Sequence, residues 1–379
     1  MNPSPRTKTT ILLLLILILA GCAPAPAAPT PTAVTATSLS STSTPTLSPT
    51  QTYTPTPTPT VEIFSTQAFE CSLQITKIKE IQVEPLKRRI WSEISHDGDL
   101  LFIFNSGEIT TFQPKTLQKV DTIQTEGIVI FGISPDGKTA VVRLDDDRIA
   151  LWDLAANQEI TSLEVPNYHN EWLHLAFSPT EREFAANWGF CEYGGKIAAW
   201  NMDTSELIWH NIKGTCAGGA ITYSPDGRII ASGETYDRNL HLWDANNGTL
   251  QESYLEDQLE WLSAVAFSPS GELLAFGTGS VGEGVLLAPI FIMDPSDYSV
   301  LYSFDGKRDT IHSLSFSPEE SLLAAGTLDG AIMLWGLQPI EHRCTLDISD
   351  NVVDVYFLSE DMLLSVNWDG VLTLWSIAE

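Results

Sequence analysis

The chain has 379 residues and a formal net charge of −28, from 48 acidic and 20 basic residues. Nucleic-acid binding requires basic patches, so this balance argues against a nucleic-acid partner. A domain this acidic is not expected to adhere by itself to anionic lipid, and membrane attachment would need a separate anchor.

Residues 1–21 have the pattern of an export signal. Arg6 and Lys8 precede the apolar run Ile11–Ala20, which is shorter than the ~20 residues needed to span a bilayer. The run ends in Leu19-Ala20-Gly21-Cys22, which resembles the bacterial lipoprotein box. That resemblance implies that Cys22 becomes the mature N-terminus and carries lipid, at the outer face of a bacterial membrane. The alternative is an ordinary signal peptide followed by a chance cysteine.

Residues 22–62 are predicted to be a disordered linker. They consist mainly of Ala, Pro, Thr and Ser, with no charged residue before Glu62. Such a composition cannot bury a core. The Thr-Pro repeat at residues 54–59 favours an extended chain, which would hold the following domain away from the membrane.

A repeated unit, most complete at residues 221–250, fills the rest of the chain. The first residue of its Ser-Pro-Asp-Gly turn falls at Ser95, Ser134, Ser178, Ser224, Ser268, Ser317 and Leu358. The successive spacings are 39, 44, 46, 44, 49 and 41 residues. This is the period of a four-stranded blade in a propeller.

An aromatic residue ends the third predicted strand of each unit, at Phe112, Trp152, Trp200, Trp243, Phe291, Trp335 and Trp375. With Trp152-Asp153 and Trp243-Asp244, the chain resembles the WD-repeat β-propeller family. The resemblance implies an all-β, seven-bladed propeller of four-stranded blades over residues 70–379. The Gly-His pair that family members often carry is missing, so the hydrogen-bonded tetrad of the family is not expected to be complete.

The strand pattern supports the same fold. The second predicted strands, such as Leu322–Ala325 and Leu273–Phe276, are continuous apolar runs, as expected of strands buried on both faces. The recurring Asp-Gly pairs are typical of hairpin turns. The last unit ends with its third strand, and residues 73–83 are apolar enough to supply the fourth and close the ring.

No pattern predicts catalysis, a metal site or a cofactor. The sequence lacks Gly-x-Ser-x-Gly and His-Glu-x-x-His. His174 and His312 are expected in first strands near the central channel. Asp145-Asp146-Asp147 could form a calcium site, although a solvated turn is the usual meaning of such a run.

Aromatic residues gather in loops that the propeller topology places on one side, namely the loops between second and third strands and the loops between blades. The loop at residues 187–195 holds Trp188, Phe190 and Tyr193 among glycines, and Tyr236 should project from the next blade. Exposed loop aromatics are common in recognition sites, so these four residues are the candidate partner-binding site. The alternative is that several such aromatics pack under strand ends.

Four cysteines lie beyond Cys22, an even number that permits disulfides in an exported domain. The loop positions predict a bond between Cys191 and Cys216 on one face and between Cys71 and Cys344 on the other. Four separate buried thiols are the alternative.

The sequence therefore predicts a lipid-anchored, extracytoplasmic interaction scaffold, monomeric and with protein partners at its loop face. WD-repeat domains are mostly scaffolds, so this function is implied by the resemblance, and fold alone does not fix it. Two alternatives stay open. One is a propeller enzyme or small-ligand or metal binder of the lactonase-like kind, and the other is a component of envelope protein assembly.

Overall fold

Seven sheets make up the described part of the computed structural model. The structure describes residues 62–64, 71–83, 90–95, 97–105, 107–125, 127–168, 173–189, 195–212, 219–233, 239–255, 261–279, 288–304, 310–348 and 350–378. These lie in the second of two compact units, Pro57–Glu379. The predictions for Cys22, for the export signal and for most of the linker fall outside the described residues.

Each sheet is one blade, numbered in chain order. Blade one contains β3 (Trp91–Ile94), β4 (Leu101–Asn105), β5 (Glu108–Gln113) and β6 (Gln118–Gln124). Blade two contains β7 (Val129–Ile133), β8 (Thr139–Arg143), β9 (Ile149–Asp153) and β10 (Gln158–Ser162). Blade three contains β11 (His174–Phe177), β12 (Glu183–Trp188), β13 (Lys196–Asn201) and β14 (Leu207–Ile212). Blade four contains β15 (Ile221–Tyr223), β16 (Ile229–Gly233), β17 (Asn239–Asp244) and β18 (Leu250–Leu255).

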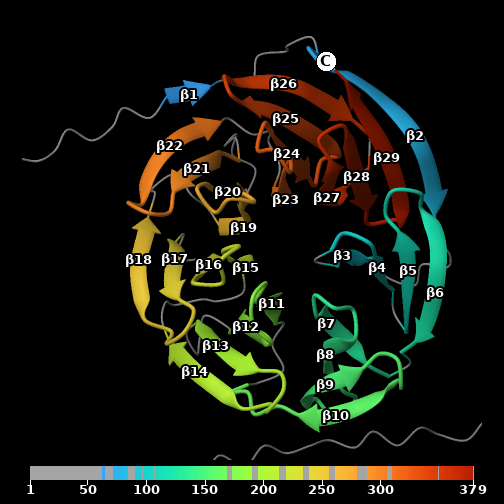
Figure 1. Ribbon diagram of the computed structural model, residues 1–379, viewed down its shortest axis with the longest axis vertical. Helices are drawn as coiled ribbons and strands as arrows, with labels where there is room; N and C mark the ends of the chain where they lie inside the picture. Colours follow the sequence, from blue (N-terminus) through green and yellow to red (C-terminus); the bar gives the residue numbers. More distant parts are fainter. Residues whose placement is uncertain are drawn as a thin grey trace, which may run out of the picture. The chain divides into compact units, whose positions relative to one another are not determined.

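Blade five contains β19 (Trp261–Phe267), β20 (Leu274–Gly279), β21 (Ile290–Asp294) and β22 (Ser299–Phe304). Blade six contains β23 (Ile311–Phe316), β24 (Leu322–Thr327), β25 (Ala331–Leu337) and β26 (Ile340–Asp347). Blade seven contains β27 (Val352–Ser359), β28 (Met362–Asn367), β29 (Val371–Ala378) and β2 (Gln74–Gln82). The blades follow one another around a common axis, with the first strand of each inside and the fourth outside (Figure 1). The predicted seven-bladed propeller is confirmed.

The repeated turn between first and second strands is held by its own side chains. In blade four the Ser224 hydroxyl donates to the Asp226 carboxylate at 2.7 Å and accepts the Ile229 amide at 2.9 Å. Gly227 follows with a φ of 73°, a conformation that glycine adopts at little cost. Blades one and two repeat these contacts, which explains why Ser-x-Asp-Gly recurs in the sequence.

The core lies between the blades. Seven buried apolar clusters occupy the described residues, and each joins two neighbouring blades. The second strands are central to these clusters: every residue of β4, β20 and β24 is buried. This confirms the interpretation of the continuous apolar runs, because a strand between two blades has no face exposed to water.

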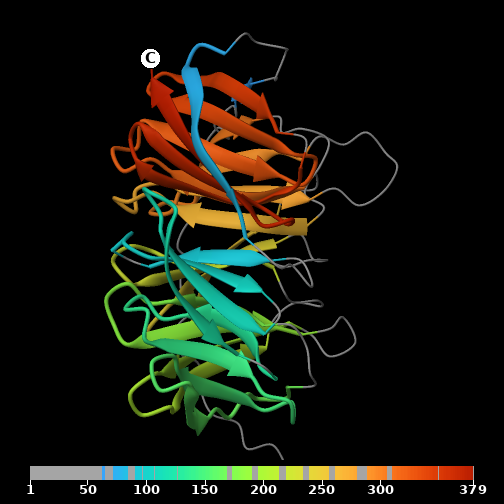
Figure 2. The same ribbon diagram turned by 90° about the vertical axis from the view of Figure 1, so that its right-hand side faces the viewer.

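Strand β2, near the N-terminal end of the described residues, closes the ring. Strand β2 pairs antiparallel with β29, from Gln74 opposite Ala378 to Gln82 opposite Val371. Figures 1 and 2 show β2 running along the outer edge of blade seven. The predicted closing strand is therefore confirmed.

Two further contacts join the N-terminal part to blades five and six. Cys71 forms a disulfide with Cys344 of β26, with Cα atoms 4.3 Å apart, which is one of the two predicted pairs. Strand β1 (Glu62–Phe64) pairs in parallel with β22 and adds a fifth strand to blade five. The linker was predicted to extend to residue 62, so the chain joins the propeller earlier than the sequence indicated.

Candidate functional site

The predicted partner site falls in a part of the loop face that the structure describes only at its edge. We define the loop face as the side that carries the connections between second and third strands and between blades. Phe190, Cys191, Tyr193, Cys216 and Tyr236 lie outside the described residues. The Cys191–Cys216 bond and the roles of these three aromatics therefore stay predictions.

Trp188 does lie in the described part, and its predicted position in an exposed loop is wrong. It is the last residue of β12, pairs with Lys196 of β13, and has a relative exposure of 0%. Its ring packs 5.9 Å from that of Trp200, in the cluster between blades two and three. Strand β12 extends further than the sequence suggested. The Trp188 side chain therefore lies in the core and is not accessible to a partner.

Other aromatics of the loop face also serve packing. Tyr168 packs against the same cluster between blades two and three. Trp368, between β28 and β29, lies edge-on to His312 of β23, with ring centroids 6.1 Å apart. The alternative that several loop aromatics pack beside strand ends is thus correct for Trp188 and Tyr168.

The inner strands hold a ladder of polar side chains that connects neighbouring blades. Ser313 and Ser315 of β23 accept backbone amides of β27 at 3.1 and 3.0 Å. Asp354 of β27 accepts the Ser92 hydroxyl at 2.6 Å and the Ser92 amide at 3.1 Å. Glu93 of β3 accepts the Ile133 amide of β7 at 2.8 Å. These contacts replace backbone pairing, which is missing between the inner strands of separate sheets.

The carboxyls of this ladder ionise at higher pH than usual. Burial raises the pKa of Glu93 from 4.5 to about 8, against the lowering effect of the Ile133 amide, and nearby Asp354 raises it further. Burial also raises the pKa of Asp354, while the bonds from Ser92 and the charge of His312 lower it. Both side chains keep partial exposure at the axis of the ring, so water there moderates the cost of their ionisation.

His174 and His312 lie in first strands, as predicted. Burial, and to a smaller degree the neighbouring His312, lowers the pKa of His174 from 6.5 to about 4. His312 places Nδ1 2.8 Å from the Val353 carbonyl oxygen, which fixes the ring. The described residues contain no group of three or more His, Cys, Asp or Glu that could hold a metal ion. In the described part of the chain, the inner strands thus present protonatable groups but no cluster that could hold a metal ion.

The sequence analysis did not single out Glu93 or Asp354. A signal was available: each is a lone carboxylate within a first strand, in Trp91-Ser92-Glu93-Ile94 and Val353-Asp354-Val355. First strands are expected at the centre of the ring. A carboxylate there must therefore be paired with another group or be protonated.

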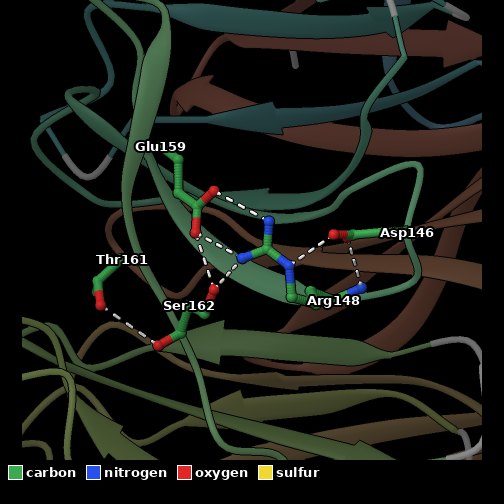
Figure 3. Close-up of polar contacts among 5 residues, drawn as sticks. All are labelled: Asp146, Arg148, Glu159, Thr161 and Ser162. Carbon is green, nitrogen blue, oxygen red and sulfur yellow. Dashed lines mark hydrogen bonds and ion pairs between the residues drawn. The ribbon is translucent and has the colours of Figure 1, made fainter.

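The acidic run between β8 and β9 forms an ion-paired turn. Arg148 Nε lies 2.7 Å from the Asp146 carboxylate, and its Nη1 lies 2.8 Å from Glu159 of β10 (Figure 3). The hydrogen bond from Arg148 lowers the pKa of Asp146. Because Asp146 already has a cationic partner, the geometry favours the interpretation as a solvated turn over a calcium site.

Comparison with known proteins supports the family resemblance. The family model described as WD domain, G-beta repeat matches residues 211–244 and 298–336, which cover most of blades four and six. An uncharacterized WD repeat-containing protein of Synechocystis is 30% identical over 156 residues, 41% of this chain and 42% of that protein. Mouse apoptotic protease-activating factor 1 is 22% identical over 75% of this chain and 21% of its own length. WD repeat and SOCS box-containing protein 1 of Xenopus tropicalis is 25% identical over 40% of this chain and 33% of its own.

The chain therefore spans less than half the length of each of these relatives. Together with the closed ring of seven blades, the matches support a WD-repeat propeller. This architecture is typical of protein-interaction scaffolds. Within the described ranges, no helix is long and apolar enough to cross a membrane.

Proposed function

We propose that this protein is a lipid-anchored, extracytoplasmic scaffold that binds a protein partner through the loop face of its propeller. The observation that carries the proposal is the closed ring of seven four-stranded blades, with WD-repeat matches at residues 211–244 and 298–336. Such a ring holds many loops on one rigid frame, which is the arrangement that recognition surfaces use.

The anchor and the cell compartment rest on the lipoprotein-type sequence ending at Cys22. The Cys71–Cys344 disulfide supports the same compartment, because such bonds persist mainly outside the cytoplasm. The partner site rests on Phe190, Tyr193 and Tyr236, now without Trp188. A component of envelope protein assembly would be one specific form of this scaffold.

Partner capture tests the proposal. The full chain with Phe190→Ala and Tyr193→Ala should fold as the unmodified chain does and lose at least about tenfold in capture, because central aromatics often contribute ~2 kcal/mol or more to binding. The measurement is quantitative capture of the proteins that the unmodified chain retains from solubilised membranes, with thermal melting as the test of folding.

A matched control replaces exposed apolar side chains away from the loop face. Val120 of β6 and Ile160 of β10 are 53% and 52% exposed on outer strands, so Val120→Ala with Ile160→Ala removes similar apolar surface elsewhere. Capture by the Phe190→Ala, Tyr193→Ala variant that equals capture by the control variant would place the site outside the blade-three loop. Capture of no protein at all would count against the scaffold.

A further inference from the structure

The outer strands of the propeller differ in charge, and this difference points to a contact surface. The fourth strand of each blade has an outer edge, where its backbone N–H and C=O groups are able to pair with a further strand. Charged residues occur in five of these strands, β2, β6, β10, β18 and β26. The two uncharged fourth strands are β14 of blade three (Leu207–Ile212) and β22 of blade five (Ser299–Phe304).

The two uncharged strands differ in whether their outer edge is covered. Proteins keep sheet edges from pairing with other molecules by placing charges on them or by covering them. Strand β22 is covered, because β1 pairs with its residues Tyr302–Phe304 (Figure 1). Strand β14 pairs only with β13 in the described part of the chain. Among the described residues, β14 is therefore the one fourth strand whose outer edge is neither charged nor covered.

Strand β14 also exposes apolar side chains to water. Ile208 is 39% exposed and Ile212 is 56% exposed, and His210 between them is exposed as well. No other described strand has two exposed large apolar residues. A strand that covered this edge would remove part of that apolar surface from water, which is favourable.

A β-bulge decides which part of each outer edge accepts a strand. Ile208 is the extra residue of the bulge in β14, as Leu301 is in β22. Strand β1 pairs with β22 only beyond this bulge, at Tyr302–Phe304. The same position on β14 is residues 209–211, and the strand continues to Ile212. An added strand therefore has the same place on β14 that β1 occupies on β22.

We propose that β14 pairs with β14 of a second copy of this chain, so that the protein forms a two-fold symmetric dimer. In such a contact the two strands run antiparallel, and any charged residue on the strand would approach its own counterpart. The uncharged β14 brings no like charges together. Pairing about Asn211 uses only residues beyond the bulge and places Ile212 of each copy opposite His210 of the other.

Two other occupants fit this edge less well. The linker at residues 22–62 consists mainly of Ala, Pro, Thr and Ser, so a strand from it would bring little apolar surface to Ile208 and Ile212. A basic partner attracted by the net charge of −28 would find no carboxylate on β14. A second copy brings two isoleucines and no charge, which matches the edge.

The dimer differs from the monomer that the sequence analysis expects, and it does not depend on the scaffold function. The missing charges on β14 gain meaning only once the strand is known to lie at an outer edge. Because β14 lies on the outer rim of the ring (Figure 1), each copy keeps its own loop face. The dimer is measured by mass and the scaffold function by partner capture, so each can fail without the other.

Sedimentation equilibrium of the full chain, in a detergent matched to the density of the solvent, measures the mass. We expect twice the mass of one chain. We also expect association to become tighter as salt is added, because each copy has a net charge of −28 and salt screens the repulsion. A one-chain mass at the highest soluble concentration, or association that salt weakens, would overturn the proposal.

A charge placed in the shared edge tests the location of the contact. Ile212→Lys should weaken association at least about tenfold, because lysine is a residue that keeps sheet edges apart. The matched control is Ile160→Lys, the same change at a 52% exposed position of β10, which should associate as the unmodified chain does. Circular dichroism shows whether both variants fold. Equal association of the two folded variants would mean that β14 does not form the contact.

A cysteine at the centre of the pairing gives a second measurement that does not depend on the lysine variant. Pairing about residue 211 brings the two Cα atoms to within the roughly 4.4–6.8 Å that a disulfide bridges. Mild oxidation of Asn211→Cys should therefore link two copies covalently, whereas Thr161→Cys on β10 should not. Linked dimers are counted by electrophoresis without reduction, against the unmodified chain. Equal linking of the two variants, or none with Asn211→Cys, would contradict the pairing.

Discussion

At the scale of single residues, the inner strands combine connection of the blades with sensitivity to pH. Glu93 holds the Ile133 amide of the next blade, and its pKa is raised from 4.5 to about 8 in the folded state. Between these two values the folded chain keeps a proton that the unfolded chain releases. The free energy of unfolding therefore decreases as pH rises from about 4.5 to about 8, to the extent set by this residue.

Glu93→Gln should remove this contribution while keeping an oxygen acceptor for the Ile133 amide. We expect the variant to be more stable than the unmodified chain at pH 8, by about 1–3 kcal/mol, and to differ little at pH 4. Denaturant unfolding at several pH values measures the difference, with Glu272→Gln on the exposed surface as the control. A variant that follows the same pH dependence as the unmodified chain would show that Glu93 does not carry this effect.

Residue chemistry also sets what the sequence can predict. Ser224, Asp226 and Gly227 form a turn from contacts within six residues, so the motif predicts the structure. The burial of Trp188 could not be predicted in this way. It depends on β12 extending to residue 188 and on blade two packing against blade three. The raised pKa of Glu93 likewise depends first on its burial in the assembled ring, and to a smaller degree on Asp354, which is 261 positions away in the chain.

At the scale of elements, the closing strand β2 does more than complete a sheet. Its segment contributes Leu73 and Val83, which are 7% and 5% exposed, to two separate clusters on either side of blade seven. The disulfide at Cys71 and the Ser72 amide, which donates to the Arg343 carbonyl at 2.9 Å, attach the same segment to blade six. The sequence predicted this strand because the seventh unit lacked one, whereas the three-residue β1 carries too short a pattern to be found.

Deletion of residues 71–83 should therefore destabilise the propeller strongly. Loss of two buried apolar side chains alone corresponds to about 3–6 kcal/mol, a large part of the usual total stability of a domain. Thermal melting compares the deletion with Ile78→Thr, a change at a 52% exposed position of β2 that should have almost no effect. An unchanged melting temperature for the deletion would mean that the ring does not need this strand.

At the scale of the whole molecule, charge and the N-terminal sequence make one argument about membrane attachment. With a net charge of −28, we expect anionic lipid to repel the chain, so the proposed attachment relies on a separate anchor. If the chain is membrane-bound, a covalent lipid at Cys22 is the group that the sequence offers. One acyl chain gives only marginal binding, and two or more are needed for stable attachment.

Cys22→Ser should release the protein from membranes, because the hydroxyl replaces the thiol that would accept lipid. We expect the unmodified chain in the detergent phase after phase partitioning and the variant in the aqueous phase, with equal melting temperatures for the two. Thr35→Ser is the matched control, since it introduces a serine near the N-terminus without changing the lipoprotein-type sequence or a predicted disulfide. If the Cys22 variant stays with membranes while remaining folded, the anchor is elsewhere and the lipoprotein interpretation fails.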